Sequence, residues 1–248
     1  MSGMGSPFTE TEVVGHPARH FQVAISAGAQ ALAWARQEGA PHGAAVWVDR
    51  EISPLGFRGR MWQVPAESTL ACAVVLRPPL PAEEGDVTWL VGALGAVAGS
   101  ESAAGTALAT WWPDAVVSAD SEEAVARVKS EVQLGPGQVR SAVVSMRFDL
   151  ERLGLGSSGR DQLLESVLGA VSGVSETVAG SEGAASVATA YGQRCALVGR
   201  RVKIRLLPRG ETRGVVGGID RTAKLELRSR AEMVERVTID MLHELEAV

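Results

Sequence analysis

The chain has little lysine, few aromatic residues and almost no cysteine. Lysine occurs only at Lys129, Lys203 and Lys224, so every other strong base is an arginine. Aromatic residues make up 4% of the sequence, so rings can fill little of the core. The two cysteines, Cys72 and Cys195, lie far apart in apolar segments. We expect them to be buried free thiols rather than a disulfide.

Patterns for metal binding, secretion and membrane insertion are also missing. The four histidines show no metal-ligand spacing and no Cys-x-x-Cys pair occurs, so we expect no metal site. The longest apolar run, Val87 to Gly99, is too short to cross a bilayer. The N-terminus lacks a basic start and an apolar signal core,. These absences favour a cytoplasmic protein with no membrane partner.

The composition that is present is typical of a globular protein. Hydrophobic residues make up 46% of the 248 residues, and the formal charge is -5. A chain of this size can bury a large core, which excludes a disordered tail protein and a disulfide-stapled miniature. The acidic balance argues against a DNA-binding role, because phosphate recognition needs clustered bases.

Hydrophobic patterning predicts an α/β part followed by an all-β part. Apolar residues at helical spacing, with caps and glycine stops, indicate helices over 26–39, 86–105 and 161–174,. Apolar or alternating runs indicate strands over 44–48, 70–76, 128–134, 139–148, 202–207, 213–219, 225–227 and 233–239,. We therefore expect a flexible lead-in over 1–19, an α/β domain over 20–185 and a small β domain over 195–248. Residues 180–190 are small and polar and read as a linker,.

Short motifs from about Phe21 to the C-terminus resemble those of the biotin–protein ligases, which share a catalytic fold with lipoate–protein ligases. The segment 56–62 is similar to the second half of the family's glycine–arginine loop, GRGRxGRxW. Trp112-Pro113-Asp114 resembles its KWPND motif. The segments around Ser26, 39–43, 76–78 and 199–245 follow the family's order as well.

The resemblance implies an α/β (α+β) fold with a mixed sheet, flanking helices and a barrel-like β domain at the C-terminus. It also implies a reaction in which biotin and ATP, with Mg, give biotinyl-adenylate, which is transferred to a lysine of a carboxylase carrier domain. A biotin-carrier or carboxylase subunit and a homodimer are the partners it suggests. Too little chain precedes Phe21 for the family's DNA-binding module. The ligand-binding residues that it implies are Ser26, Gly56, Arg58, Gly59, Arg60, Trp62, Trp112 and Asp114.

The departures from the family pattern fall on the residues that carry the chemistry. The family's lysine of KWPND aligns with Trp111, its second lysine with Ala124, and a loop arginine with Phe57. A glutamine that contacts biotin aligns with Glu51. Two glycines that approach the ligand align with Arg127 and Arg147. Loss of one transition-state donor costs about 2.7–4 kcal/mol, so this set predicts impaired ligation.

Three functions are consistent with this pattern. The first is a catalytically impaired protein of this type that binds a small ligand or a partner protein. The second is a divergent active ligase in which cations such as Arg58 and Arg60 act as the catalytic residues, with biotin, ATP and Mg retained. The third is an interaction module with a filled pocket. For Arg127 and Arg147 a new anion site is one hypothesis, and a solvent-facing or salt-bridged role is the favoured one.

Overall fold

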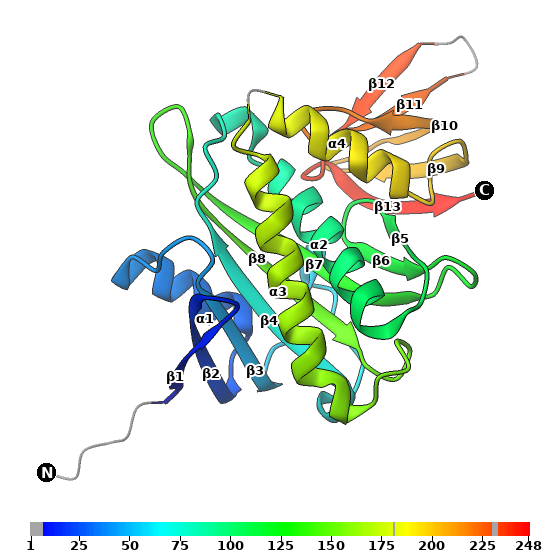
Figure 1. Ribbon diagram of the computed structural model, residues 1–248. Coiled ribbons are helices and arrows are strands. Elements are labelled where there is room, and N and C mark those ends of the chain that lie inside the picture. The colour runs from blue at the N-terminus through cyan, green and yellow to red at the C-terminus, as the bar shows by residue number, and fades with distance from the viewer. Residues whose placement is uncertain (1–6, 181, 230–232) are drawn as a thin grey trace, which may run out of the picture.

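A mixed eight-stranded sheet forms the larger part of the molecule in this computed structural model, which describes residues 7–180, 182–229 and 233–248 (Figure 1). Strand β2 runs parallel to β3, and the other neighbouring strands are antiparallel. In sheet order the strands are β1 (Thr9–Val13), β2 (His16–Ala24), β3 (Ala45–Glu51), β4 (Thr69–Leu76), β8 (Val139–Asp149), β7 (Ala124–Leu134), β6 (Ala115–Ser118) and β5 (Leu108–Trp111). The predicted strands and the predicted hairpin of the α/β part are thus present.

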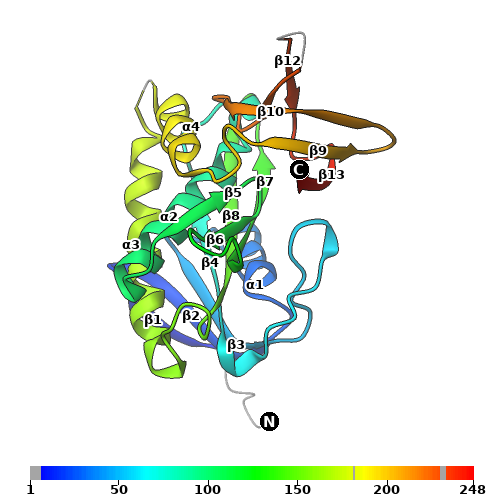
Figure 2. The same ribbon diagram turned by 90° about the vertical axis from the view of Figure 1, so that its right-hand side faces the viewer.

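Helices cover both faces of this sheet. On one face lies α1 (Ala27–Ala33), which continues into a π-helical turn over Trp34–Glu38. The other face carries α2 (Val87–Ala104), α3 (Arg160–Thr177) and α4 (Gly183–Arg194). Figure 2 shows the two layers on opposite sides of the strands. The central strands carry buried apolar side chains on both faces of the sheet, as expected for a sheet that is covered on both sides.

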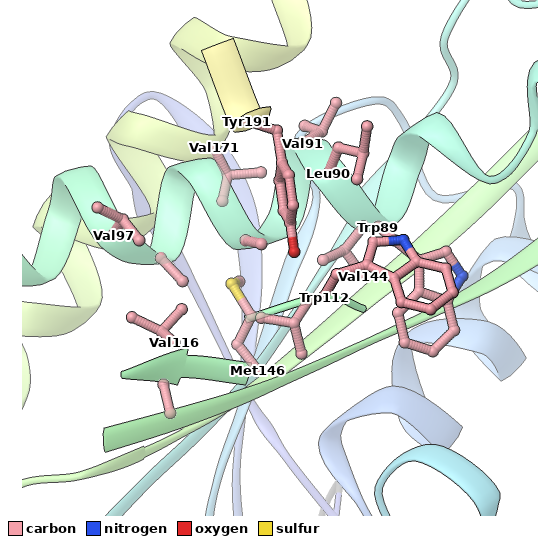
Figure 3. Packing of buried hydrophobic residues seen from close by; sticks show 14 of the residues in the cluster. Trp89, Leu90, Val91, Val97, Trp112, Val116, Val144, Met146, Val171 and Tyr191 are labelled. Carbon is pink, nitrogen blue, oxygen red and sulfur yellow. The ribbon is translucent and has the colours of Figure 1, made fainter. Parts of the chain in front are cut away.

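Small residues let α2 pack closely against α3. A Cβ atom at Gly99 would lie 2.5 Å from the Cα of Val167, and one at Gly95 would lie 2.8 Å from the Cα of Val171. Beneath this helix pair, the side chains of α2 pack onto Met146 and its neighbours on the sheet (Figure 3). Cys72 and Cys195 lie buried in the same core cluster as free thiols.

A five-stranded antiparallel sheet follows at the C-terminus. Its order is β12 (Val234–Val237), β11 (Leu225–Arg228), β10 (Glu211–Ile219), β9 (Arg201–Leu206) and β13 (Leu242–Ala247). The indole Nε1 of buried Trp112 donates to the main-chain oxygen of Ala223 at 3.0 Å. This bond ties the C-terminal sheet to the larger one.

Two expectations about irregular segments are wrong. Residues 9–13 and 16–19 belong to β1 and β2, so the lead-in expected over 1–19 is regular sheet there, while residues 1–6 lie outside the described part. The linker expected over 180–190 is largely α4. Ala184, Val187 and Ala188 of this helix are buried in the core. The small side chains of the segment therefore allow close packing and do not indicate a flexible linker. In the described residues no helix is long and apolar enough to cross a membrane.

Candidate functional site

The loop that joins β3 to β4 forms one wall of the candidate site. It leaves the sheet after Glu51 and contains the segment that resembles the glycine–arginine loop. Phe57 anchors it, because its ring is buried and lies edge-on against Trp89 at a centroid distance of 5.6 Å. Arg58 adopts a left-handed backbone with φ of 56°, followed by Gly59 at 69°. The loop is thus folded around a ring at the position where the family has an arginine.

The two arginines that survive in this loop bind main-chain oxygens of the C-terminal domain. Arg58 donates through Nε to the oxygen of Leu242 at 3.1 Å and through Nη2 to that of Asp240. Arg60 donates through Nη2 to the oxygen of His243 at 3.2 Å. Arg58 therefore acts as a strut between the loop and the C-terminal segment, and Arg60 keeps part of its guanidinium directed to the cleft.

Glu51 and Arg147, both named as departures from the family, form a closed ion pair. Each side chain is 4% exposed. Arg147 donates to Glu51 through Nε and through Nη2, the latter at 3.2 Å, and its Nη1 donates to the oxygen of Leu55 at 3.3 Å. All three guanidinium nitrogens are thus engaged, as a buried charge requires.

Glu51 also reaches the start of α1. Its Oε1 accepts from the main-chain N–H of Ala27 at 2.7 Å, while Ser26 accepts from Ala29 at 3.1 Å as the helix cap. Ser26 therefore has the capping role that is usual for a serine at this position. The polar groups at this end of the pocket are satisfied by the protein's own side chains. Only about 100 Å³ of space remains beside Glu51, below the range typical of small-molecule sites.

Burial in the core close to this pair suppresses the chemistry of Cys72. Desolvation, together with the nearby Glu51 carboxylate, raises the pKa of the Cys72 thiol to about 12, with Arg147 opposing the shift. A thiol with this pKa stays protonated at neutral pH and is a poor nucleophile. The candidate site therefore contains no reactive cysteine at Cys72.

Asp114 and Arg127 form a second ion pair that is open to the cleft. Nη1 of Arg127 donates to both carboxylate oxygens of Asp114 at 3.2 Å. The side chain of Arg127 is 36% exposed and that of Asp114 is 11% exposed. Burial raises the pKa of Asp114, and the charges of Arg127 and Arg60 oppose that rise. Arg127 is thus salt-bridged, as the sequence favoured, and it also remains accessible.

Two adjoining cavities meet at this open pair. One, of about 290 Å³, lies below the loop and is lined by Phe57, Arg60, Trp62 and Arg127 among others. The other, of about 250 Å³, lies between the larger sheet and β13 and shares Phe57, Arg60 and Arg127. Since Asp114 and Ala124 also line both, the two cavities form one cleft with the open pair at its centre.

The tryptophans expected near the ligand lie around this cleft in different roles. The indole of Trp62 donates to the hydroxyl of Thr69 at 3.0 Å, which fixes the end of the loop. Trp111 lies on the cavity wall with the guanidinium of Arg200 5.4 Å from its ring centre. Trp112 belongs to the core and borders the second cavity. A tryptophan with a cation above it thus stands where the family has a lysine.

Some residues of the cleft were not found from the sequence. Arg152 lines the cavity below the loop, and it donates to the main-chain oxygen of Ala124 at 2.9 Å. The β13 residues from Leu242 to Leu245 line the other cavity. The apolar residues 242, 245 and 247 of β13 do not alternate, because a register shift falls between Leu242 and Glu244, so this strand carried no clear sequence signal. Gly56 borders the first cavity and Gly59 lies beyond it in the adjoining turn.

The arrangement of sheets, loop and cleft defines a known fold. The chain has the fold of the biotin protein ligases and is biotin-protein-ligase-like. A biotin protein ligase from Aquifex aeolicus, in complex with biotin and ATP, superposes with a TM-score of 0.72 at 17% identity, covering 93% of this chain and 99% of that one. A biotin protein ligase-like protein of unknown function from Silicibacter sp. TM1040 gives a TM-score of 0.70 at 16% identity, covering 94% and 98%.

Similarity in sequence is weaker than similarity in fold. The bifunctional ligase/repressor BirA of Bacillus spizizenii is 25% identical over 145 residues, which are 58% of this chain. The matched stretch spans 43% of the length of that relative. No family model matches the chain. The likeness therefore establishes the fold and leaves the chemistry to be argued from the site itself.

Proposed function

We propose that this protein is a biotin-protein-ligase-like binding protein that does not form biotinyl-adenylate. The observation that carries the proposal is the closed ion pair of Glu51 and Arg147. These two residues align with a glutamine that contacts biotin and with a glycine that approaches the ligand in the resembling family. A buried pair of charged side chains at these positions supports a pocket that is closed to biotin.

Entry of biotin would have to break this pair. Removing one partner of a buried ion pair typically costs about 3–5 kcal/mol, because the other charge is left uncompensated. Biotin offers no cation to replace Arg147 beside the Glu51 carboxylate. The space of about 100 Å³ beside Glu51 is too small to take the ligand on that side of the pair,. The biotin end of the pocket is therefore closed by charge as well as by volume.

The activation step also lacks its usual cations. Trp111 stands at the position of the motif lysine and Ala124 at the position of the second lysine. Arg58 is committed to main-chain oxygens of Asp240 and Leu242. Charge developing during adenylate formation would lack both lysines of the family pattern, and preorganised donors of this kind are usually the largest catalytic term. The open cleft supports binding, whereas adenylate formation has no equipped site.

A transfer assay tests the proposal directly. The protein is incubated with biotin, ATP, Mg²⁺ and a carboxylase carrier domain, with an active biotin protein ligase as the positive control. We expect no biotinylated carrier lysine by mass spectrometry and no biotin-binding heat by calorimetry. The Glu51→Gln, Arg147→Gly variant, which restores the family's residues, is expected to gain measurable biotin binding. Biotin transfer by the unmodified protein that is lost in Arg60→Ala would overturn the proposal.

A further inference from the structure

The cavity below the loop has a strongly uneven charge. Four arginines line it, and the single acidic side chain among its lining residues is Asp114. The chain as a whole is acidic, with a formal charge of -5. The lining of this cavity is therefore positively charged although the chain as a whole is negatively charged. A concave site lined by one sign of charge raises the local concentration of ions of the opposite sign.

The arginines of this cavity differ in how far they are already used. Arg147 is fully engaged with Glu51 and the oxygen of Leu55. Arg152 bonds the oxygen of Ala124 and lies 3.3 Å from a carboxylate oxygen of Asp149. These two guanidiniums serve the protein's own structure.

Arg60 and Arg127 keep unused donors. Arg127 bonds Asp114 only through Nη1, and Arg60 bonds the oxygen of His243 only through Nη2. Within the described part of the chain, no partner is found for the other nitrogens of these two groups. Since Asp114 is the acidic group close to both, one carboxylate faces two guanidiniums.

Other acids at the rim of the cleft are paired elsewhere. Glu122 binds Arg200, and Glu244 binds Arg205 at 2.9 Å. Neither carboxylate is therefore available to neutralise the excess charge at the centre of the cleft. The uncompensated positive charge lies at the junction of the two cavities, where Arg60 and Arg127 border both.

We propose that Arg127 and Arg60 together hold a compact oxyanion, a carboxylate or a phosphate, at the junction of the two cavities. The inference rests on the proposed function, because it requires the cleft to be free of an adenylate. Guanidinium forks match the planar or tetrahedral oxygens of such groups. Phe57, Met61, Trp62 and Val64 line the same cavity, so a short apolar body attached to the anion would lie against them.

Calorimetric titration of the intact protein tests this site with defined probes. Inorganic phosphate and the acetate, butanoate and hexanoate ions are titrated separately at low ionic strength. We expect Arg127→Ala and Arg60→Ala each to weaken binding by roughly 10- to 150-fold, as for the loss of a hydrogen bond to a charged group. If the natural anion is a carboxylate, affinity rises by about fourfold per buried methylene along the series. If it is a phosphate, inorganic phosphate binds more tightly than all three carboxylates.

Arg213→Ala provides the matched control. Arg213 is an exposed arginine on β10 that pairs with Glu211 outside both cavities, so its loss changes the net charge equally. It is expected to leave anion binding unchanged. Arg60→Ala also guards against misfolding, because Arg60 makes only one main-chain contact whereas Arg127 neutralises the nearly buried Asp114.

Two results would overturn the inference. One is the absence of binding by all four probes, and the other is an equal loss in Arg213→Ala, which would show general charge screening. Neither result affects the ligase assay, whose outcome depends on biotin transfer to a carrier. Transfer of biotin would refute the proposed function whatever the anion titrations give, and the absence of both transfer and anion binding would refute only the anion site.

Discussion

Two ion pairs occupy neighbouring parts of the same cleft and are built in opposite ways. In the closed pair, Glu51 and Arg147 are each 4% exposed and every guanidinium nitrogen has a partner. In the open pair, Arg127 is 36% exposed and bonds Asp114 through a single nitrogen. Glu51, Arg147 and Arg127 stand at positions where the resembling family has uncharged residues.

The difference shows how the same kind of substitution can fill one pocket and build another. An arginine that meets a buried carboxylate from across the sheet, as Arg147 meets Glu51, becomes part of the interior, and its charge is no longer available to a ligand. An arginine that meets its carboxylate at the rim keeps donors for an external anion. The surrounding burial, rather than the residue type, decides which outcome follows.

The largest expected effect is the difference in the free energy of unfolding between Arg147→Ala and Arg127→Ala. Arg147→Ala leaves the Glu51 carboxylate buried and unpaired, and we expect it to lower the free energy of unfolding by about 3–5 kcal/mol. Arg127→Ala breaks a partly exposed pair, for which about 1 kcal/mol or less is expected. Urea unfolding of both variants measures the contrast. Equal losses would show that the two pairs are energetically alike and would break the comparison.

A smaller effect is expected when both members of the closed pair are replaced together. Buried ion pairs exchanged for apolar residues of similar volume are often as stable as the original or more so. Glu51→Leu combined with Arg147→Met should therefore recover at least about 2 kcal/mol of the loss seen in Arg147→Ala, offset in part by the N–H of Ala27, which loses its acceptor,. The same urea titration gives the value. A double variant as unstable as Arg147→Ala would mean that packing, not charge, holds this pocket.

The smallest expected effect concerns the pH dependence of the open pair. Because burial raises the pKa of Asp114, the folded state holds a proton at pH values where the unfolded state has lost it. Stability from this group is therefore present at low pH and is lost as pH rises through the raised pKa. Asp114→Asn should gain stability relative to the unmodified protein on going from pH 4 to pH 7.

Unfolding titrations at pH 4 and pH 7 give this difference directly. Asp161→Asn, at an exposed aspartate in the first turn of α3, provides the baseline for an aspartate-to-asparagine change. The prediction is contradicted if the free energy of unfolding of Asp114→Asn, relative to that of the unmodified protein, is higher at pH 4 than at pH 7. Such a result would show that pairing with Arg127, rather than burial, dominates at Asp114.

Sequence patterns were sufficient for the architecture because its elements carry strong local signals. The strand over 70–76, the hairpin around 135–137 and the long helix α3 all follow from apolar periodicity and turn residues. The patterns failed where the signal depends on packing. Residues 180–190 are small and polar and look like a linker, yet 183–194 form α4 because Val187 and Tyr191 have a core to enter.

The site could be predicted residue by residue but not as pairs. Motif alignment identified Glu51, Arg147 and Arg127 as departures from the family, and Asp114 as a ligand-binding residue that the resemblance implies. It could not show that Glu51 meets Arg147, because β4 lies between their strands in the sheet. Nor could it separate a buried pair from an accessible one, since burial depends on how the loop folds over the strands.

The anchorage of the glycine–arginine loop has a mechanical consequence. Arg58 and Arg60 bind the main chain of 240–243 rather than its side chains, so substitutions there leave the anchors in place. The loop that forms one wall of the cleft is thereby attached to the C-terminal sheet. A partner that binds the C-terminal sheet and rotates it would therefore also displace the loop and change the shape of the cleft.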